Sequence, residues 1–285
     1  MTGIAVTSAG HLRSDADHLD RHFKYARADY EASLQYVGIQ PGWNVLDAGC
    51  GGGNFLPLIS AAVGPTGKIF AVDLAPENVY RAAQLAKECG LAAPVHVQTG
   101  NIVKLPFDDG AFDCVWSANV MQYLSEEQFQ LAVGEFKRVL KPKGVLAVKE
   151  KDTGILQMLS VEPDLIWRLF AARRAAASQT GLLGPWSGSS IPGRLRRSGL
   201  EDVERKGWLV ERWAPFVGGP RRHVKAMFEH FAAMAERHDV PPTDKLYWRA
   251  VADNPGTLLD TPDFCIRELF VVAKGRTVEG RVVVT

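Results

Sequence analysis

Apolar residues recur along the first half of this chain with two alternating spacings. Short apolar runs bounded by turn residues predict β-strands over residues 43–48, 68–72, 95–98, 112–117 and 145–149. Between them, helical spacing predicts helices over residues 53–62, 76–88 and 126–140, the last with Ser125 as its N-cap. Strands that alternate with helices of this length predict a parallel sheet with right-handed crossovers.

The segments on either side of this pattern predict further helices and one late pair of strands. Residues 19–38 have an approximately helical spacing and predict a helix laid against the fold or over its ligand. After Glu150 the pattern predicts helices over 155–180, 221–238 and 243–252, a loop over 181–193, and strands over 203–213 and 264–273.

A glycine turn follows the first predicted strand. The strand ends at Asp47, and the turn carries Gly49, Gly51 and Gly53. Glycine allows positive φ and lets the backbone approach a ligand closely. The spacing excludes the dinucleotide fingerprint G-x-G-x-x-G, because its third glycine would fall on Asn54 or Leu56, and no P-loop lysine follows. An acid just before the turn would repel a pyrophosphate, and it suits a ligand end that carries an ammonium group.

This D-x-G-x-G-x-G segment resembles motif I of the class I S-adenosylmethionine-dependent methyltransferases. The runs L-P-F at 105–107, F-D-C-V at 112–115 and F-K-R-V-L-K-P-K-G at 136–144 resemble those of the ubiquinone and menaquinone methyltransferase-like group. The resemblance covers about residues 40–150. It implies an α/β fold: a Rossmann-like parallel sheet with a late antiparallel strand, helices on both faces, and helical cap insertions.

The resemblance also implies the cofactor, S-adenosyl-L-methionine, with S-adenosyl-L-homocysteine as its product. Asp73 ends the second strand and would accept the ribose hydroxyls, with Leu74 beside it. Asn101 stands where the group usually has Asp, and its amide oxygen can still accept from the adenine amine. The implied cofactor-binding residues are Asp47, Gly49, Gly51, Gly53, Asp73, Leu74, Asn101, Ile102, Ser117 and Asn119.

The same resemblance suggests a division of the chain. Residues 1–39 would form an N-terminal helical lid, and residues 40–150 the Rossmann-like cofactor-binding core. Residues 201–213 and 263–275 would be the closing strands of the core. Residues 151–200 and 214–262 would then be insertions that form a substrate cap.

Methyl transfer from a sulfonium needs alignment of the nucleophile and, for many acceptors, a base within reach. Glu150 ends the fifth strand, where such a group is expected, although a structural carboxylate is the alternative. His223 on a cap helix is a second catalytic candidate, with a packing role as its alternative. Candidate substrate contacts are Tyr25 in the lid, Trp186 in a loop and Arg173, and His22 is a further lid contact.

Composition narrows the partners. The chain has 285 residues and a net charge of +1, so no general field attracts nucleic acid. Four scattered cysteines without a C-x-x-C pair predict neither a disulfide framework nor a zinc site, and they fit a reducing cytoplasm. We expect no metal and no membrane-inserted segment, and a homo-oligomer is compatible with the sequence.

These features predict an enzyme that methylates an O, N or C nucleophile of a small molecule. The aromatic residues after Glu150 and the paired arginines suit an aromatic or apolar, and in part anionic, metabolite. The alternatives are a non-catalytic S-adenosylmethionine-binding protein and an NAD-type oxidoreductase.

Overall fold

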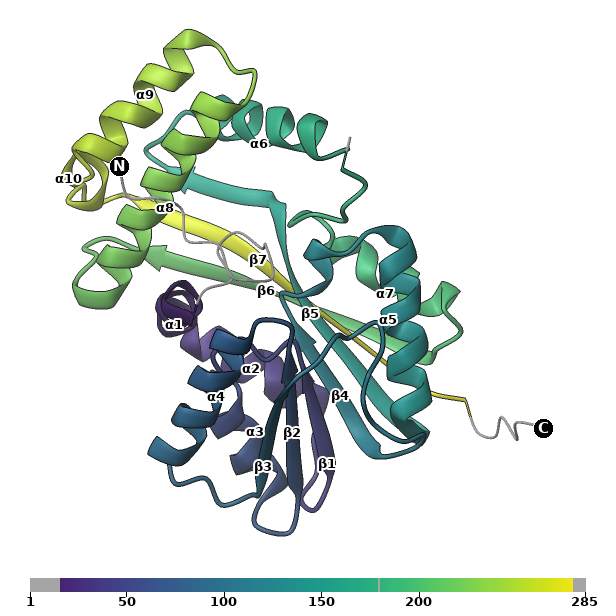
Figure 1. Cartoon of the computed structure of the whole chain (residues 1–285). Coiled ribbons are helices and arrows are strands. Elements are labelled where there is room, and N and C mark those ends of the chain that lie inside the picture. Colours follow the sequence, from purple (N-terminus) through teal and green to yellow (C-terminus); the bar gives the residue numbers. More distant parts are fainter. Residues whose placement is uncertain (1–15, 179, 279–285) are drawn as a thin grey trace.

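A seven-stranded sheet forms the frame of the molecule, with the strand order β3-β2-β1-β4-β5-β7-β6 (Figure 1). This computed structural model describes residues 16–178 and 180–278. The strands are β1 (Asn44–Ala48), β2 (Lys68–Asp73), β3 (Val95–Thr99), β4 (Phe112–Ala118), β5 (Leu140–Leu159), β6 (Glu201–Trp213) and β7 (Cys265–Arg276). Strands β1 to β5 pair in parallel, and β7 lies antiparallel between β5 and β6. The predicted sheet with its late antiparallel strand is confirmed.

Helices cover both faces of this sheet, because successive strand residues point to opposite sides. Val45 packs into one apolar cluster with α2 (Arg27–Val37), α3 (Leu56–Val63) and α4 (Pro76–Glu88), a side called here the α2 face. Leu46 packs into a second cluster with α5 (Glu126–Val139) and α7 (Ile191–Arg197), called the α5 face. The predicted capping box of Ser125 is present at the start of α5.

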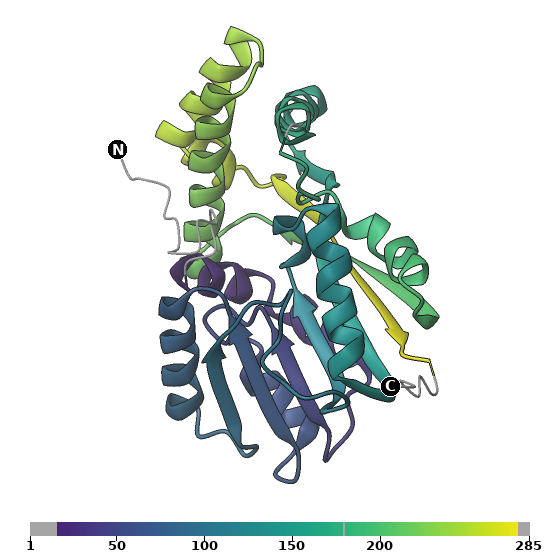
Figure 2. The same cartoon turned by 45° about the vertical axis from the view of Figure 1, so that its right-hand side comes forward.

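The remaining long helices lie beyond the ends of the short strands, against the extended parts of β5, β6 and β7 (Figures 1 and 2). They are α6 (Pro163–Ser178), α8 (Gly218–Arg237) and α9 (Pro242–Asp253), followed by the short α10 (Gly256–Leu259). Their buried side chains, among them Leu165, Phe228 and Trp248, join the apolar cluster of the α2 face. None of the helices within the described residues is long and apolar enough to cross a membrane.

The helix predicted over 155–180 is wrong in its first part. Strand β5 continues past Glu150 and pairs with β7 as far as Leu159, and α6 begins only at Pro163. Leu156 and Met158 are buried while the residue between them is exposed, which is the period of a strand. A run this short does not distinguish helix from strand by spacing alone, and pairing with β7 decides it.

The single helix predicted over 19–38 is in fact two helices, α1 (Ala16–Tyr25) and α2. The chain bends at Ala26, and the Tyr25 carbonyl accepts a hydrogen bond from Arg212 Nε at 3.2 Å. Of the predicted lid, residues 1–15 lie outside the described residues. The division into lid, core and cap stays a prediction.

Candidate active site

The turn between β1 and α3 brings three glycines close to neighbouring side chains. Gly49, Gly51 and Gly53 have φ values of 83°, 51° and 84°, in the left-handed region that favours glycine. A Cβ on Gly49 would lie 2.4 Å from Val120 Cγ2, and one on Gly51 would lie 2.5 Å from Leu19 Cδ1. The turn is therefore bracketed by the loop after β4 and by α1.

Asp47 lies buried at the base of this turn. Its Oδ2 is enclosed and has no hydrogen-bond partner among the described residues. Burial, and secondarily the negative charge of Asp73, raises the pKa of this carboxyl to about 8. A cation at the turn would satisfy the oxygen and stabilise the ionised form. The residue thus fits an ammonium group, as the sequence predicts.

Asp73 at the end of β2 connects three parts of the site. Its Oδ2 accepts from the backbone N–H of Gly51 at 2.8 Å, and its Oδ1 accepts from Ala75 N–H at 3.0 Å and from Asn78 Nδ2 at 3.2 Å. The carboxylate thereby holds the glycine turn against the first turn of α4. Two carboxylate oxygens provide about four acceptor positions, so capacity remains for a ribose hydroxyl. The neighbouring Leu74 is exposed.

The two residues predicted to contact adenine follow β3. Asn101 Oδ1 accepts from Val103 N–H at 3.1 Å, so this oxygen already shapes its own turn. Ile102 is buried in the cluster of the α5 face. Gly100 N–H donates to the Asp73 carbonyl at 3.0 Å, which places this turn directly beside the end of β2.

The two polar residues at the end of β4 have different surroundings. Ser117 is fully buried, and its Oγ donates to the Ala48 carbonyl at 2.8 Å, tying β4 to β1. Asn119 has a φ of 60° and lies between α2 and β5. Its Nδ2 donates to the Tyr30 hydroxyl at 3.0 Å, and its Oδ1 accepts from Lys149 Nζ at 2.8 Å.

Asn119 belongs to a buried polar chain on the α2 face. Beyond it, the Tyr30 hydroxyl lies 2.7 Å from His22 Nδ1, so the chain runs from Lys149 on β5 to α1. Lys149 is fully buried, with its Nζ 3.4 Å from the centre of the Phe270 ring. Burial, and next the charge of Lys151, lowers the pKa of Lys149 well below its usual range.

His223 of α8 and Tyr25 of α1 meet beside this chain. Their rings stack with centroids 4.5 Å apart, and the His22 ring lies 5.2 Å from that of His223. Lys151 forms an ion pair with Glu268 of β7 nearby. Two sequence-predicted residues, Tyr25 and His223, are thus brought together with Asn119 and Lys149.

Glu150 lies on the opposite face of β5 from Lys149 and Lys151, because strand residues alternate. Its Oε1 accepts from Met121 N–H at 2.7 Å, and its Oε2 is buried without a hydrogen-bond partner among the described residues. Burial raises the pKa of Glu150 to about 7, against the opposing effects of Lys149 and of backbone N–H groups, first that of Met121. The side chain holds the loop that brackets the glycine turn.

The other two predicted substrate residues also lie away from His223. Arg173 of α6 has its pKa lowered by burial and, in opposition, raised by nearby Tyr123. Trp186 stands 5.4 Å from the Arg174 guanidinium, measured to the ring centre. The turn that carries it is bound to the loop after β4, since Gly184 N–H donates to the Gln122 carbonyl at 3.0 Å. Arg173 and Trp186 are thus near Glu150's loop.

Sequence reasoning missed Tyr30, Lys149, Lys151 and Glu268 as site residues. A signal for two of them exists in the run Lys149-Glu150-Lys151-Asp152 at the end of a buried strand. Charged residues in a buried strand need partners and often mark function. Tyr30 is one apolar position in a helical pattern, and Glu268 lies within a predicted strand. The sequence therefore contains no further signal that marks either residue as functional.

Comparison with known proteins agrees with this arrangement. The family described as "Methyltransferase domain" matches residues 45–144. A demethylmenaquinone methyltransferase of Staphylococcus aureus is 28% identical over 194 residues, which are 65% of this chain and 76% of that protein. A 37.1 kDa protein in transposon Tn4556 of Streptomyces fradiae is 34% identical over 127 residues, 45% of this chain, and the chain spans only 35% of that relative.

Solved structures show the same fold. The YcgJ protein of Bacillus subtilis has a TM-score of 0.57 at 18% identity, covering 88% of this chain and all of that one. The [4+2]-cyclase SpnF has a TM-score of 0.51 at 20% identity, covering 88% of this chain and 82% of that one.

The fold, the glycine turn and its acids define a class I S-adenosylmethionine-dependent methyltransferase domain. Residues 45–144 match the methyltransferase domain family, and the chain is similar to the ubiquinone and menaquinone methyltransferase-like group. Its cofactor is S-adenosylmethionine, and the NAD interpretation is thereby set aside.

Proposed function

We propose that this chain transfers a methyl group from S-adenosylmethionine to an O, N or C nucleophile of a small molecule. The observation that carries the proposal is the buried Asp47 Oδ2 at the base of the glycine turn, which has no hydrogen-bond partner in the part of the chain that the structure describes. A Cβ at Gly49 would lie 2.4 Å from Val120 Cγ2, and the positive φ of Gly49 and Gly51 favours glycine at both positions. The Asp47 carboxylate lies beside a turn whose backbone a ligand can approach closely. Its negative charge suits the ammonium group of the cofactor's amino-acid tail and disfavours a phosphate.

The sheet order supports a direction for the bound cofactor. The ribose and adenine candidates, Asp73 and Asn101, follow β2 and β3, on one side of β1. The reacting end of the cofactor must therefore be directed to the other side, toward β4 and β5. There the protein provides Asn119, Lys149 and the paired rings of Tyr25 and His223. The acceptor would enter from this side and be aligned with the donor methyl group, which the cofactor supplies already activated.

Helix α1 would be the lid of this site. Leu19 contacts the glycine turn, and His22 and Tyr25 follow on the same helix at spacings of three residues, so all three lie along one side. The same helix thus reaches both the cofactor turn and the acceptor side. Closure of α1 would exclude water from the transfer. Residues 151–200 and 214–262, apart from the extension of β5, would form the cap around the acceptor.

The acceptor would be a small aromatic or apolar metabolite. The rings of Tyr25, His223 and Phe270 on the acceptor side support this, as does the 28% identity to a demethylmenaquinone methyltransferase. The four cysteines, all free in the structure, support a reducing, cytoplasmic location. A non-catalytic S-adenosylmethionine-binding protein is the second candidate.

Two measurements test the proposal. Calorimetry with S-adenosylhomocysteine should show binding to the full chain, and Asp47→Asn should weaken it about tenfold or more, because the ammonium loses its charged partner. Radiolabelled S-adenosylmethionine should then transfer label to at least one member of a panel of phenols, quinols and amines. Binding of NAD in place of S-adenosylhomocysteine would overturn the proposal, and cofactor binding without turnover across the panel would favour the non-catalytic candidate.

A further inference from the structure

A group of polar side chains lies buried between α1, α8, β5 and β7, on the acceptor side of the cofactor turn. Its members are His22, Tyr25, Lys149, Lys151, His223 and Glu268, called here the polar cluster. Apart from Lys151, which is partly exposed, each is less than one-tenth exposed. Sequence reasoning assigned no role to Lys149. The proposed methyl transfer places the acceptor near Lys149 but gives this residue no role of its own.

The charge balance of the polar cluster is incomplete. Glu268 Oε1 is paired with Lys151, and Glu268 Oε2 is buried without a hydrogen-bond partner among the described residues. Lys149 makes its hydrogen bond to a neutral amide and faces the rings of Phe270 and Tyr30, without an ion pair to a carboxylate among the described residues. A buried ammonium without an ionic partner is costly in free energy. An anion brought by a ligand would supply the missing partner.

The hydrogen bonds of the chain also determine the tautomer of His22. The Lys149 amino group donates to Asn119 Oδ1, so the Asn119 amide nitrogen must be the donor to the Tyr30 oxygen. The Tyr30 hydroxyl proton is then directed at its remaining partner, His22 Nδ1. Burial, and next the charge of Lys151, lowers the pKa of His22, so the ring is neutral. A neutral ring that accepts at Nδ1 carries its proton on Nε2.

Two donors of the polar cluster therefore have no acceptor within the described residues. They are His22 Nε2 and the Tyr25 hydroxyl, both buried. Burial, and next the charge of Glu268, raises the pKa of Tyr25, so the phenol keeps its proton and donates. The rings of both residues contact the His223 ring, which lies between them. These two donors and the Lys149 amino group, which has no ionic partner among the described residues, share one chemistry: an anionic oxygen would accept from all three and would favour the charged form of Lys149.

We propose that Lys149, His22 and Tyr25 bind an anionic oxygen of the methyl acceptor, so that the acceptor is a phenolate, enolate or carboxylate. This inference rests on the proposed function. Adjacent strands lie about 4.8 Å apart, which places β5 about 10 Å and β7 about 14 Å from β1. That separation, opposite to the adenine side, favours the acceptor over the carboxylate of the cofactor as the source of the anion.

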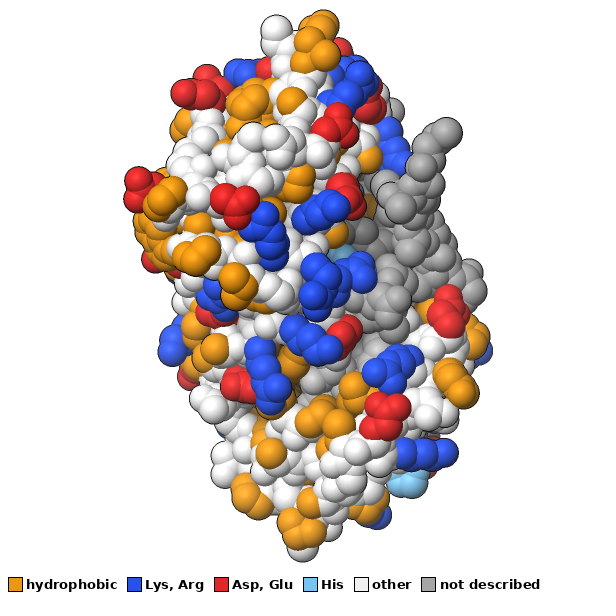
Figure 3. Space-filling view, turned by 90° about the vertical axis from the view of Figure 1, so that its left-hand side faces the viewer, with side chains coloured by type: hydrophobic (Ala, Val, Ile, Leu, Met, Phe, Trp, Pro, Cys, Tyr) orange, Lys and Arg blue, Asp and Glu red, His pale blue; other side chains and the backbone are white. Residues whose placement is uncertain are grey.

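The surface near α1 and α8 is consistent with the approach of an anionic ligand. Figure 3 views the molecule from the side where these helices lie in Figure 1. It shows a His side chain recessed in the middle of this face, with Lys and Arg side chains close by. Positive charge on a face of a protein raises the local concentration of anions near it.

The probe for this site is 4-nitrophenol, because only its ionised form absorbs visible light. The full chain is saturated with S-adenosylhomocysteine, and the phenol is added at a pH where it is mostly neutral in water. We expect the wild type to bind it as the phenolate and develop the visible band. Lys149→Met should weaken phenolate binding more than tenfold. Tyr25→Phe, which keeps the ring and removes one donor, should weaken it about fivefold.

The outcomes separate the sources of the anion. If Lys149→Met weakens binding of S-adenosylhomocysteine and leaves phenolate binding unchanged, the anion is the cofactor carboxylate and the inference is overturned. Absence of the visible band with the wild type also overturns it, provided calorimetry shows that S-adenosylhomocysteine binds. Failure of S-adenosylhomocysteine itself to bind would contradict the proposed function instead. Should Lys149→Met not fold, the effect of Tyr25→Phe decides.

Discussion

At the scale of single residues, burial gives two carboxyl groups unusual proton affinities. Asp47 lies under the glycine turn with a pKa of about 8, and Glu150 lies under the loop after β4 with a pKa of about 7. Each has one oxygen without a hydrogen-bond partner among the described residues. Asp47 has the negative charge of Asp73 as a second cause, whereas Glu150 is opposed by Lys149. A cation bound at the glycine turn would therefore lower the pKa of Asp47 more than that of Glu150.

The proton on Asp47 predicts pH-dependent cofactor binding. Below pH 8 the free protein holds this proton, and the ammonium of S-adenosylhomocysteine favours its release, so binding is coupled to loss of a proton. Affinity should therefore fall as the pH is lowered from 8 to 6, by up to about tenfold per unit. Calorimetry in buffers of different ionisation enthalpy measures the proton directly.

Two controls accompany this measurement. Asp47→Asn should bind S-adenosylhomocysteine weakly and without the pH slope. Methylthioadenosine, which lacks the amino-acid tail, should bind the wild type with little dependence on pH over the same range. An equal slope for the wild type and Asp47→Asn would assign the proton to another group.

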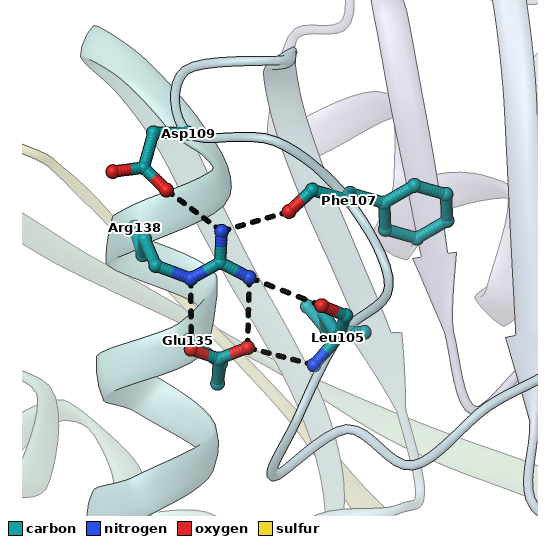
Figure 4. A network of polar contacts seen from close by, with 5 residues as sticks. All are labelled: Leu105, Phe107, Asp109, Glu135 and Arg138. Atoms are coloured by element: carbon teal, nitrogen blue, oxygen red, sulfur yellow. Dashed lines mark hydrogen bonds and ion pairs between the residues drawn. The ribbon is translucent and has the colours of Figure 1, made fainter.

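At the scale of elements, one arginine joins α5 to the loop before β4. Arg138 donates to Glu135, Asp109 and the carbonyls of Leu105 and Phe107, while Glu135 also accepts from Leu105 N–H at 2.7 Å (Figure 4). Two of the family-like runs, at 105–107 and 136–144, are therefore in direct contact. The second run therefore has a structural role, because the planar guanidinium of Arg138 donates to several acceptors at once.

Replacing this arginine should destabilise the fold without touching the acceptor side. Arg138→Lys keeps the positive charge but loses the planar set of guanidinium donors, and we expect the free energy of unfolding to fall by about 1 kcal/mol. Arg138→Met loses both the charge and the donors, and we expect a fall of about 2–3 kcal/mol. Urea unfolding monitored by circular dichroism measures both. A matched control is Arg237→Met at the end of α8, which lies outside this network. Equal stability of the Met variant and the wild type would contradict the structural role.

At the scale of the whole molecule, buried carboxyl groups couple stability to pH. Glu150 titrates near 4.5 in an unfolded chain and near 7 in the folded one, so between these values the folded state holds more protons. Its contribution therefore lowers the free energy of unfolding as the pH rises through this window, and it levels off above pH 7. The sign is opposite to that of an ion-paired carboxylate.

The variant Glu150→Gln tests this coupling. Gln keeps the acceptor for Met121 N–H and has no charge to bury, so its stability relative to the wild type should rise between pH 4.5 and 7. The gain should approach the order of 3 kcal/mol at pH 7.5. Chemical unfolding at pH 5, 6 and 7.5 gives the difference, and Glu229→Gln on an exposed position of α8 serves as control. If Glu150→Gln also keeps full turnover, Glu150 is structural and not the base.

Local pattern was sufficient for the core between β1 and β4. Strand β2 and helix α4 occur where spacing and capping place them, because short crossovers leave few alternatives. Local pattern was insufficient where contacts between residues far apart in the sequence determine the secondary structure. The run after Glu150 is a strand because it pairs with β7, and the helix predicted over 19–38 is two helices, α1 and α2, which meet where Arg212 binds the Tyr25 carbonyl.

The candidate site divides in the same way. Glycine spacing and Asp47 indicate the methyl donor from sequence, because the residues that carry this pattern lie within one local turn of the chain. The proposed acceptor side is assembled from α1, β4, β5, α8 and β7, which are up to about 250 residues apart in the sequence. Only the fold decides that Lys149 and His223 lie on one face of the sheet while Glu150 lies on the other. Strand alternation is the physical reason, since neighbours in sequence then belong to opposite faces of the sheet.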